Sequence, residues 1–226
     1  MGNIGLRIVR DFERPSAALI ERFRGLPVAN IDDCMNRTAA VSPEIKPVNK
    51  AKLLGPAFTV KVPEGDNLMF HKAMDMAKAG DIVVIDAGGD TKRAIFGALM
   101  VNYCRVRGLG GVIVDGAIRD FEELSAMEDF PVYARAVTPN GPYKNGPGEI
   151  NTVISFGGRV VRPGDIIVGD ADGIVVIDPA EADCIAQKAE VVLNMEDGIL
   201  KKIVEEHSYV RPWVDEKLAA IGCELA

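Results

Sequence analysis

Arg119 and Asp120, adjacent in the sequence, are the two side chains of this chain with the clearest potential for chemistry. A guanidinium group is planar and suits the two oxygens of a carboxylate or the oxygen of a developing enolate. A carboxylate beside it suits a hard divalent cation such as Mg²⁺, which usually takes one or two carboxylates and keeps several waters. With oriented N–H groups nearby, the pair would stabilise an enolate, the intermediate of retro-aldol cleavage or decarboxylation of 2-oxo acids. The alternative for such a pair is a surface ion pair without chemistry.

The elements around this pair read as one strand–helix–strand unit. Residues 81–86 are a short apolar run typical of a buried strand, and Gly88-Gly89 supplies a turn after it. A helix is predicted over 91–107 and a second buried strand over 112–115. The predicted packed side of that helix carries Ile95, Leu99, Tyr103 and Val106. Parallel crossover units of this kind carry loops and chemistry at the carboxyl ends of their strands, so we expect Arg119-Asp120 to face the glycine turn.

A second helix is predicted from about Leu68 to Lys78, with Asp66 or Asn67 as its cap. Its N-terminal N–H groups could hold a carboxylate. His71 lies one turn inside this helix. It is either a packed helical histidine or, because Asp66 and Asn67 beside it are polar, a ligand or acid–base group in the same cleft.

The rest of the chain alternates short strands and helices. Short helices are predicted near 14–25 and 27–37, the latter with Asn30 as a cap, and Pro56 is expected to confine part of a strand over 53–62 to a sheet edge. Further along we predict a short helix from 121, a strand over 131–136, a loop over 138–151, hairpins over 152–162 and 163–178, a helix to about 206 and a last one ending near 222. The apolar side of the helix to 206 is expected to be Cys184, Ala186, Ala189, Val192 and Leu193.

Length and composition favour one α/β domain of 226 residues, with a helical appendage at the C-terminus. The net charge of −7 argues against a nucleic-acid partner, because phosphate binding needs clustered Lys and Arg. No segment has the ~20 apolar residues that cross a bilayer, and the N-terminus lacks the apolar core of a signal peptide. Four widely spaced cysteines and two histidines disfavour structural zinc and indicate the reduced thiols of a cytoplasmic protein.

Several motifs, in order along the chain, resemble those of the RraA-like family. They are Gly65-Asp-Asn67, Gly80-Asp-Ile-Val-Val, Phe96-Gly97-x-Leu99, Arg105-x-Arg-Gly, Gly111-Val-Ile-Val-Asp-Gly-Ala-Ile-Arg-Asp120, Pro163-Gly-Asp165 and Asp170-x-Asp-Gly-Ile-Val-Val-Ile. The family includes class II 4-hydroxy-4-methyl-2-oxoglutarate / 4-carboxy-4-hydroxy-2-oxoadipate aldolases and the regulator of ribonuclease E activity. The resemblance runs from about Asn30 to Pro179.

The resemblance implies a swivelling β/β/α-type fold, homotrimers or homohexamers, and a site between subunits. The family core would span about 26–179, with the helices of 180–226 at subunit contacts. Asp120 would ligate Mg²⁺ or Mn²⁺, and Arg119 would bind pyruvate oxygens and steady the enolate. The backbone N–H groups of Leu99 and Met100, which follow Gly97, would hold the pyruvyl carboxylate. Asn67 and Gly97 complete the expected substrate-binding set.

One position departs from the aldolase pattern. Where the aldolases carry an acid that holds a metal-bound water, twenty residues before the arginine, this chain has Ala98. Asp66, Asp90 or, from a neighbouring subunit's C-terminal helix, Glu196 could substitute for it. The leading hypothesis is therefore a divalent-metal lyase on small 2-oxo acids. The alternatives are a non-catalytic regulator of ribonuclease E and a related metal enzyme with a different substrate.

Overall fold

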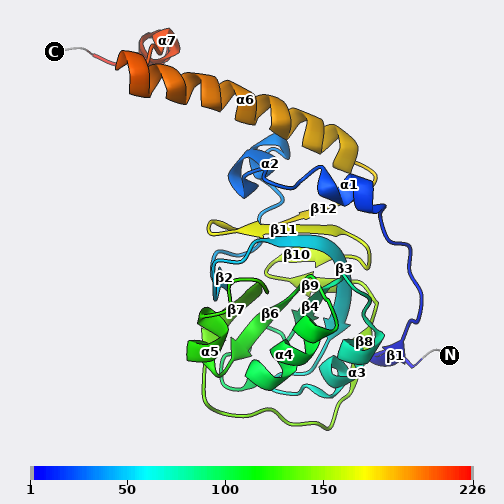
Figure 1. Ribbon diagram of the computed structural model, residues 1–226. Helices are drawn as coiled ribbons and strands as arrows, with labels where there is room; N and C mark the ends of the chain where they lie inside the picture. Colours follow the sequence, from blue (N-terminus) through cyan, green and yellow to red (C-terminus); the bar gives the residue numbers. More distant parts are fainter. Residues whose placement is uncertain (1–2, 225–226) are drawn as a thin grey trace. The chain divides into compact units, whose positions relative to one another are not determined.

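The computed structural model describes residues 3–224, which divide into two compact units, one ending at Ala189 and the other beginning at Glu190. The first unit is an α/β structure, which confirms the predicted class. Within the described residues its main sheet has ten strands, and its central path runs β1-β8-β3-β4-β6-β7-β2 (Figure 1). These strands are Leu6–Ile8, Gly148–Ile150, Leu53–Lys61, Ile82–Asp86, Gly111–Ile118, Val132–Val137 and Lys46–Pro47.

The strands β3, β4, β6 and β7 run parallel to one another in the middle of this sheet. β4 is buried at every residue, because side chains pack against both of its faces. Val83 and Ile85 enter one apolar cluster, while Ile82 and Val84 enter the other. Parallel strands covered on both faces read as continuous apolar runs, which is why the sequence Ile-Val-Val-Ile identified this strand.

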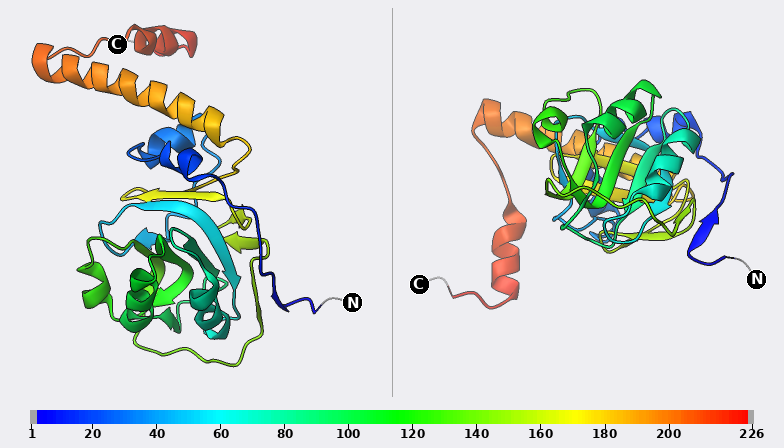
Figure 2. Two further views of the ribbon diagram at one scale, coloured as in Figure 1. Left: turned by 45° about the vertical axis from the view of Figure 1, so that its right-hand side comes forward. Right: turned by 90° about the horizontal axis from the view of Figure 1, so that it is seen from below.

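Helices cover one face of the parallel strands, and a β-hairpin lies against the other (Figures 1 and 2). The helical layer consists of α3 (Leu68–Met76), α4 (Ala98–Val106) and α5 (Phe121–Ser125). The hairpin consists of β9 (Ile154–Phe156) and β10 (Arg159–Val161). The second predicted hairpin is also present, as β11 (Ile166–Asp170) and β12 (Gly173–Ile177), and β11 pairs with residues 53–56 of β3.

The helix before β6 differs from the sequence prediction in its start and in its packed side. A short strand, β5 (Ala94–Phe96), precedes α4 and pairs with β6, so the helix begins only at Ala98. The buried side is made of small or slender side chains, Ala98, Val101 and Cys104. The larger apolar side chains predicted to pack are instead exposed, and they are Leu99, Tyr103 and Val106.

Other boundaries follow the sequence with two local differences. α1 is Ala17–Glu21, capped by Ser16, and α2 is Val28–Cys34, whose N-cap is Pro27. Asn30 therefore lies buried inside α2 rather than at its start. The loop predicted over 138–151 contains a strand, β8, which pairs with both β1 and β3.

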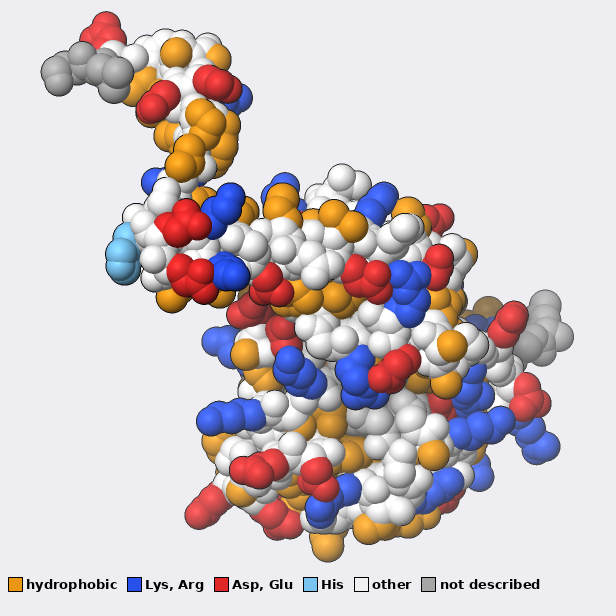
Figure 3. All heavy atoms as spheres, turned by 45° about the horizontal axis from the view of Figure 1, so that its top comes forward, with side chains coloured by type: hydrophobic (Ala, Val, Ile, Leu, Met, Phe, Trp, Pro, Cys, Tyr) orange, Lys and Arg blue, Asp and Glu red, His pale blue; other side chains and the backbone are white. Residues whose placement is uncertain are grey.

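The second unit consists of the distal part of α6 (Ala182–Glu206) and α7 (Pro212–Ala220). Exposed apolar side chains gather on this unit (orange in Figure 3) and include Val204, Val210, Trp213 and Ile221. In the proximal part of α6 the buried residues are Ala182, Ile185, Ala186 and Ala189. Cys184, which was predicted on the apolar side, is exposed.

Two further expectations concern the thiols and the membrane. The four cysteines are free, with Cys104 buried and Cys184 and Cys223 exposed. Within residues 3–224, none of the helices combines the length and apolar character required to cross a bilayer.

Candidate active site

A cavity of about 340 Å³ opens where β6 ends and α4 begins. This volume suits a small organic ligand. Residues from four separate segments line the cavity, and they are Asn67, His71, Ile95, Phe96, Gly97, Leu99, Met100, Arg119, Asp120, Gly141, Pro142 and Lys144. The structure therefore brings together Arg119, Asp120 and the predicted substrate-binding residues.

Asp120, the N-cap residue of α5, has an unusual backbone conformation. Its φ of 59° and ψ of 40° lie in the left-handed region, which a non-glycine residue seldom adopts and which is enriched at functional sites. Its carboxylate oxygen Oδ2 accepts a hydrogen bond of 2.9 Å from the backbone N–H of Ala98. The N-terminus of α4 therefore orients the side chain of Asp120, the N-cap of α5.

Arg119 presents a guanidinium group that is largely available to a ligand. About half of its side chain is exposed, and within the described part of the chain its ion pair is with Asp120, at 3.9 Å between Nε and Oδ2. That separation is beyond hydrogen-bond distance. Its backbone is fixed, because the N–H of Arg119 donates to the carbonyl oxygen of Phe96 at 3.0 Å.

The first turn of α4 supplies one free backbone donor rather than two. The N–H of Met100 donates to the Gly97 carbonyl oxygen at 3.2 Å, and that of Ala98 is bound to Asp120. Within residues 3–224, the N–H of Leu99 has no backbone or side-chain acceptor. Leu99 is therefore the residue of this turn whose N–H group can reach a ligand carboxylate, as orphan donors at helix starts do.

Two buried polar atoms on the wall formed by α3 lack hydrogen-bond partners in the described structure. Asn67 donates from Nδ2 to the Ile95 carbonyl oxygen at 2.8 Å, but its Oδ1 is unpaired although the residue is only 1% exposed. The Nε2 atom of His71 is also shielded and unpaired. An unpaired buried acceptor costs roughly 1–3 kcal/mol, so both atoms are suited to a bound ligand.

Another part of the cavity lining belongs to the loop over 141–146, which Asp66 fastens to the start of α3. Its Oδ2 accepts from the N–H groups of Asn145 and Gly146 at 2.6 and 3.0 Å, while its Oδ1 accepts from Leu68 at 2.9 Å. The Asp66 carboxylate thus caps α3 and anchors the loop. It is absent from the cavity lining, so its side chain has a structural use distinct from the predicted contact with metal-bound water.

The glycine turn lies away from this cavity, which corrects the expectation that it faces Arg119-Asp120. Gly88 and Gly89 follow β4 and approach a separate buried network, with the Gly89 N–H donating to the Asp115 carbonyl oxygen at 3.0 Å. Asp90, which we also considered as a substitute acid, accepts from the Lys92 N–H at 3.1 Å and is likewise absent from the cavity lining.

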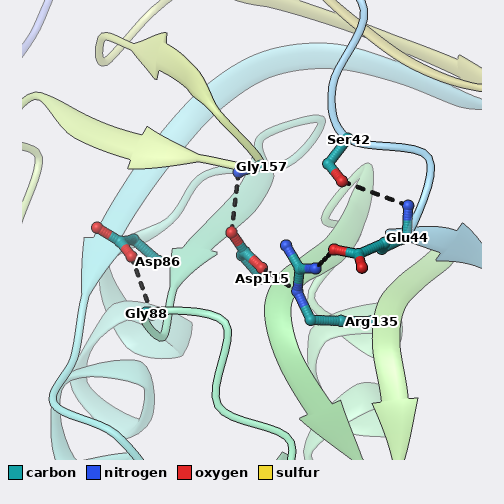
Figure 4. A network of polar contacts seen from close by, with 7 residues as sticks. All are labelled: Ser42, Glu44, Asp86, Gly88, Asp115, Arg135 and Gly157. Atoms are coloured by element: carbon teal, nitrogen blue, oxygen red, sulfur yellow. Dashed lines mark hydrogen bonds and ion pairs between the residues drawn. The ribbon is translucent and has the colours of Figure 1, made fainter.

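That network is centred on Asp115 (Figure 4). Its carboxylate accepts from Arg135 Nε at 2.6 Å and from the Gly157 N–H at 2.9 Å, and Arg135 also pairs with Glu44. Burial raises the pKa of Asp115, the hydrogen bond from the Gly157 N–H opposes this shift, and the charge of Asp86 on the neighbouring strand adds to it. Because it joins β6, β7 and the β9–β10 turn, we interpret the network as structural. Sequence reasoning missed it, although an acid after each buried strand was a visible signal.

The carboxylate of Asp120 is compatible with a Mg²⁺ or Mn²⁺ site in which water supplies most of the other ligands. The hydrogen bond from Ala98 uses Oδ2, which leaves Oδ1 for a cation. Within the described chain, no cluster of three or more His, Cys, Asp or Glu could hold a metal. One carboxylate suits Mg²⁺, which retains waters and uses ligand oxygens, and would not suit a cage metal such as structural zinc. Glu196 lies exposed on α6 in the second unit.

A larger cavity of about 570 Å³ is lined mainly by residues 47–52 and 170–172, but two of its buried polar groups are already paired. Asn49 donates to the carbonyl oxygens of Leu124 and Phe130, and the Tyr133 hydroxyl donates to the Asp170 carbonyl oxygen at 2.9 Å. Lys50 and Lys52 in its lining are exposed. The cavity at Arg119 is therefore the better candidate for a site.

Known proteins resemble this chain over most of its length. The family model RraA-like, described as Aldolase/RraA, matches residues 28–176. A protein of Halalkalibacterium halodurans named "Putative 4-hydroxy-4-methyl-2-oxoglutarate aldolase" is 44% identical over 200 residues, covering 88% of this chain and 95% of that one.

Two solved structures share the fold. The RNA-processing inhibitor RraA from Thermus thermophilis has a TM-score of 0.61 at 28% identity, covering 67% of this chain and 92% of its own. An uncharacterized protein from Pseudomonas syringae has a TM-score of 0.76 at 20% identity, covering 85% of this chain and 95% of its own, which supports the fold alone.

Proposed function

The chain belongs to the RraA-like family, and from this premise we propose that it is a divalent-metal-dependent lyase acting on small 2-oxo acids. The reaction would be retro-aldol cleavage that releases pyruvate, oxaloacetate-type decarboxylation, or both. The observation that carries the proposal is the cavity in which Arg119 and Asp120 stand beside a free backbone donor and two unpaired buried polar atoms.

In this proposal each side chain has a defined task. Arg119 binds the 2-oxo and carboxylate oxygens of the substrate, since its planar fork matches their geometry. The Leu99 N–H group binds the remaining carboxylate oxygen at the start of α4, and Asn67 Oδ1 accepts a hydrogen bond from a bound water. Mg²⁺ or Mn²⁺ held by Asp120 would supply charge stabilisation for the enolate oxygen.

We further propose that the site lies beside a contact with a second copy of the chain, in a homotrimer or homohexamer. Leu99, Tyr103 and Val106 form an exposed apolar stripe along α4, and Leu99 is 86% exposed at the rim of the cavity itself. Contiguous exposed apolar side chains commonly mark interaction surfaces. The free thiols agree with a cytoplasmic location, which we also propose.

The test is pyruvate release from 4-hydroxy-4-methyl-2-oxoglutarate and from oxaloacetate, measured with Mg²⁺ or Mn²⁺ and with EDTA. We expect activity that requires the cation and is abolished by Asp120→Ala. Asp129→Ala is the matched control, because Asp129 is exposed and pairs with Arg105 away from the cavity. Absence of cation-dependent activity on either acid, together with no stabilisation of the protein by the cation, would refute the proposal.

A second candidate function rests on Ala98. A methyl group cannot accept a hydrogen bond from a metal-bound water, and the fold is shared with an RNA-processing inhibitor, so a regulator of ribonuclease E is the alternative. Affinity capture against purified ribonuclease E tests this directly. Recovery of a stable complex from a protein inactive on 2-oxo acids would favour regulation. A third outcome, cation-dependent activity on another acid, would identify a related metal enzyme.

A further inference from the structure

We propose that His71 exchanges the proton of the substrate hydroxyl group during carbon–carbon cleavage, in place of a carboxylate at position 98. This inference rests on the proposed lyase function and names the group that handles the proton. It starts from the cavity lining, where His71 is the side chain with a nitrogen that can both accept and donate a proton near neutral pH.

The position of His71 on α3 directs it into the same space as Asn67. The two residues are four apart, so their side chains lie on one face of the helix, and the His71 N–H donates to the Asn67 carbonyl oxygen at 3.0 Å. Both line the cavity, and each carries a shielded atom without a partner in the described structure, Nε2 on His71 and Oδ1 on Asn67. A bound water has two protons to donate to such atoms, whereas a substrate hydroxyl group has one, which in this proposal goes to Nε2.

Ala98 is absent from the cavity lining and cannot take this part. Its side chain is 5% exposed and packs into the apolar cluster under α4, and its backbone N–H is already bound to Asp120. The polar counterpart is His71 on α3, which lines the same cavity as Arg119 and whose shielded Nε2 has no partner in the described structure. Proton exchange is therefore assigned to α3 rather than to position 98.

The charges around His71 favour its neutral form. Burial lowers the pKa of His71 below its usual value of 6.5, Lys144 on the facing loop lowers it further, and Asp75 on the same helix opposes them. Arg119 and Asp120, with opposite charges, line the same cavity. At pH 7 the imidazole is therefore mostly uncharged and can accept a proton.

The chemical step balances within the site. Nε2 takes the proton of the C4 hydroxyl, the C4–O bond becomes a carbonyl, and the C3–C4 bond breaks. Its electron pair becomes the enolate of pyruvate, which Arg119 stabilises. The imidazolium then returns its proton to C3, which yields two carbonyl products and regenerates neutral His71. Decarboxylation of oxaloacetate differs, because it forms the same enolate without first removing a proton.

The experiment compares these two reactions in His71→Gln, with His207→Gln as the matched control, since His207 is the other histidine and is exposed. We expect kcat for retro-aldol cleavage to fall ~10²-fold or more, the usual contribution of a general base. KM should change little, and decarboxylation should fall far less. In the wild type, kcat/KM for cleavage should drop as the pH falls through the lowered pKa of His71, and this limb should be absent from His71→Gln.

A second readout does not depend on turnover. With two histidines in the chain, imidazole NMR signals assigned through His207→Gln report the pKa of His71 directly. Pyruvate bound in the cavity should raise that pKa, because a nearby carboxylate favours the imidazolium. Equal losses in both reactions, an unchanged pH profile, or a His71 signal insensitive to pyruvate would overturn the inference. Cation-dependent decarboxylation by the wild type would leave the lyase proposal standing in each of these cases.

Discussion

Gly97→Ala tests how closely the start of α4 is fitted to Asp120. Gly97 has a φ of −145° and a ψ of −166°, an extended conformation that alanine adopts without strain. In the folded protein the effect of the substitution is therefore steric. A Cβ atom there would lie 2.9 Å from Arg119 Cγ and 3.0 Å from Asp120 Cγ, with the Asp120 carboxylate oxygen nearer still. Both side chains proposed to bind the ligand would have to move.

The size of the effect follows from these contacts. Restoring ordinary van der Waals separation requires Asp120 to move by about 1 Å, a displacement that can cost ~10²-fold in rate. The move would also break the hydrogen bond from the Ala98 N–H, worth about 1.5–3 kcal/mol because the acceptor is charged. Restricting the unfolded chain returns about 0.4–1 kcal/mol. We therefore expect a net loss of stability of roughly 1–2 kcal/mol, a Tm decrease of about 2–8 °C.

The assay is kcat/KM for cation-dependent pyruvate release, with thermal unfolding measured with and without Mg²⁺. Gly198→Ala is the control, because Gly198 lies inside α6 with no atom within 4 Å of a built Cβ. It should keep full activity. If Gly97→Ala retains kcat/KM within about threefold of the wild type and keeps its stabilisation by Mg²⁺, the steric reasoning about Asp120 is wrong.

Two further predictions concern the scaffold. Arg14 forms two 2.7 Å hydrogen bonds with the buried carboxylate of Asp81. Arg14→Met should therefore lower the free energy of unfolding, measured by urea denaturation, by roughly 3 kcal/mol. Arg24→Met, which removes the exposed ion pair with Glu21, should leave it nearly unchanged. Equal effects of the two substitutions would contradict this. Burial raises the pKa of the Cys104 thiol to about 12. At pH 8 a thiol reagent should therefore modify exposed Cys184 quickly and Cys104 only after unfolding. Rapid modification of Cys104 in the folded protein would contradict this prediction.

The sequence was sufficient for the sheet because its parallel strands are apolar on both faces. It was misleading for α4, where two apolar stripes compete. The stripe with the larger side chains, Leu99, Tyr103 and Val106, is the stronger periodic signal, yet the sheet packs against Ala98, Val101 and Cys104. Periodicity counts apolar residues and carries no information on how closely a helix approaches the strands beneath it.

The candidate site was predictable in part for a similar reason. Arg119 and Asp120 are adjacent in the chain, so their proximity could be predicted without knowledge of the fold. The family motifs predicted that Asn67, Gly97 and Leu99 lie near them, and all of these residues line the cavity. The position of the Gly88-Gly89 turn depends on the path that the chain takes after β4. The unpaired state of His71 Nε2 depends on every atom around it. These properties arise from tertiary packing, which residue types and spacing do not encode locally.

The loop over 141–146, part of which lines the cavity, has the composition of a flexible segment, yet it is held at many points. Besides the two bonds to Asp66, Tyr143 exchanges backbone hydrogen bonds with Gly65 and Asn67, and the Arg93 guanidinium stacks 4.1 Å from the Tyr143 ring. The conformational entropy of this wall is therefore lost when the protein folds and not when a ligand binds. Binding of a small acid then spends little of its interaction free energy on ordering the loop. The shape of this pre-ordered wall determines which acids fit.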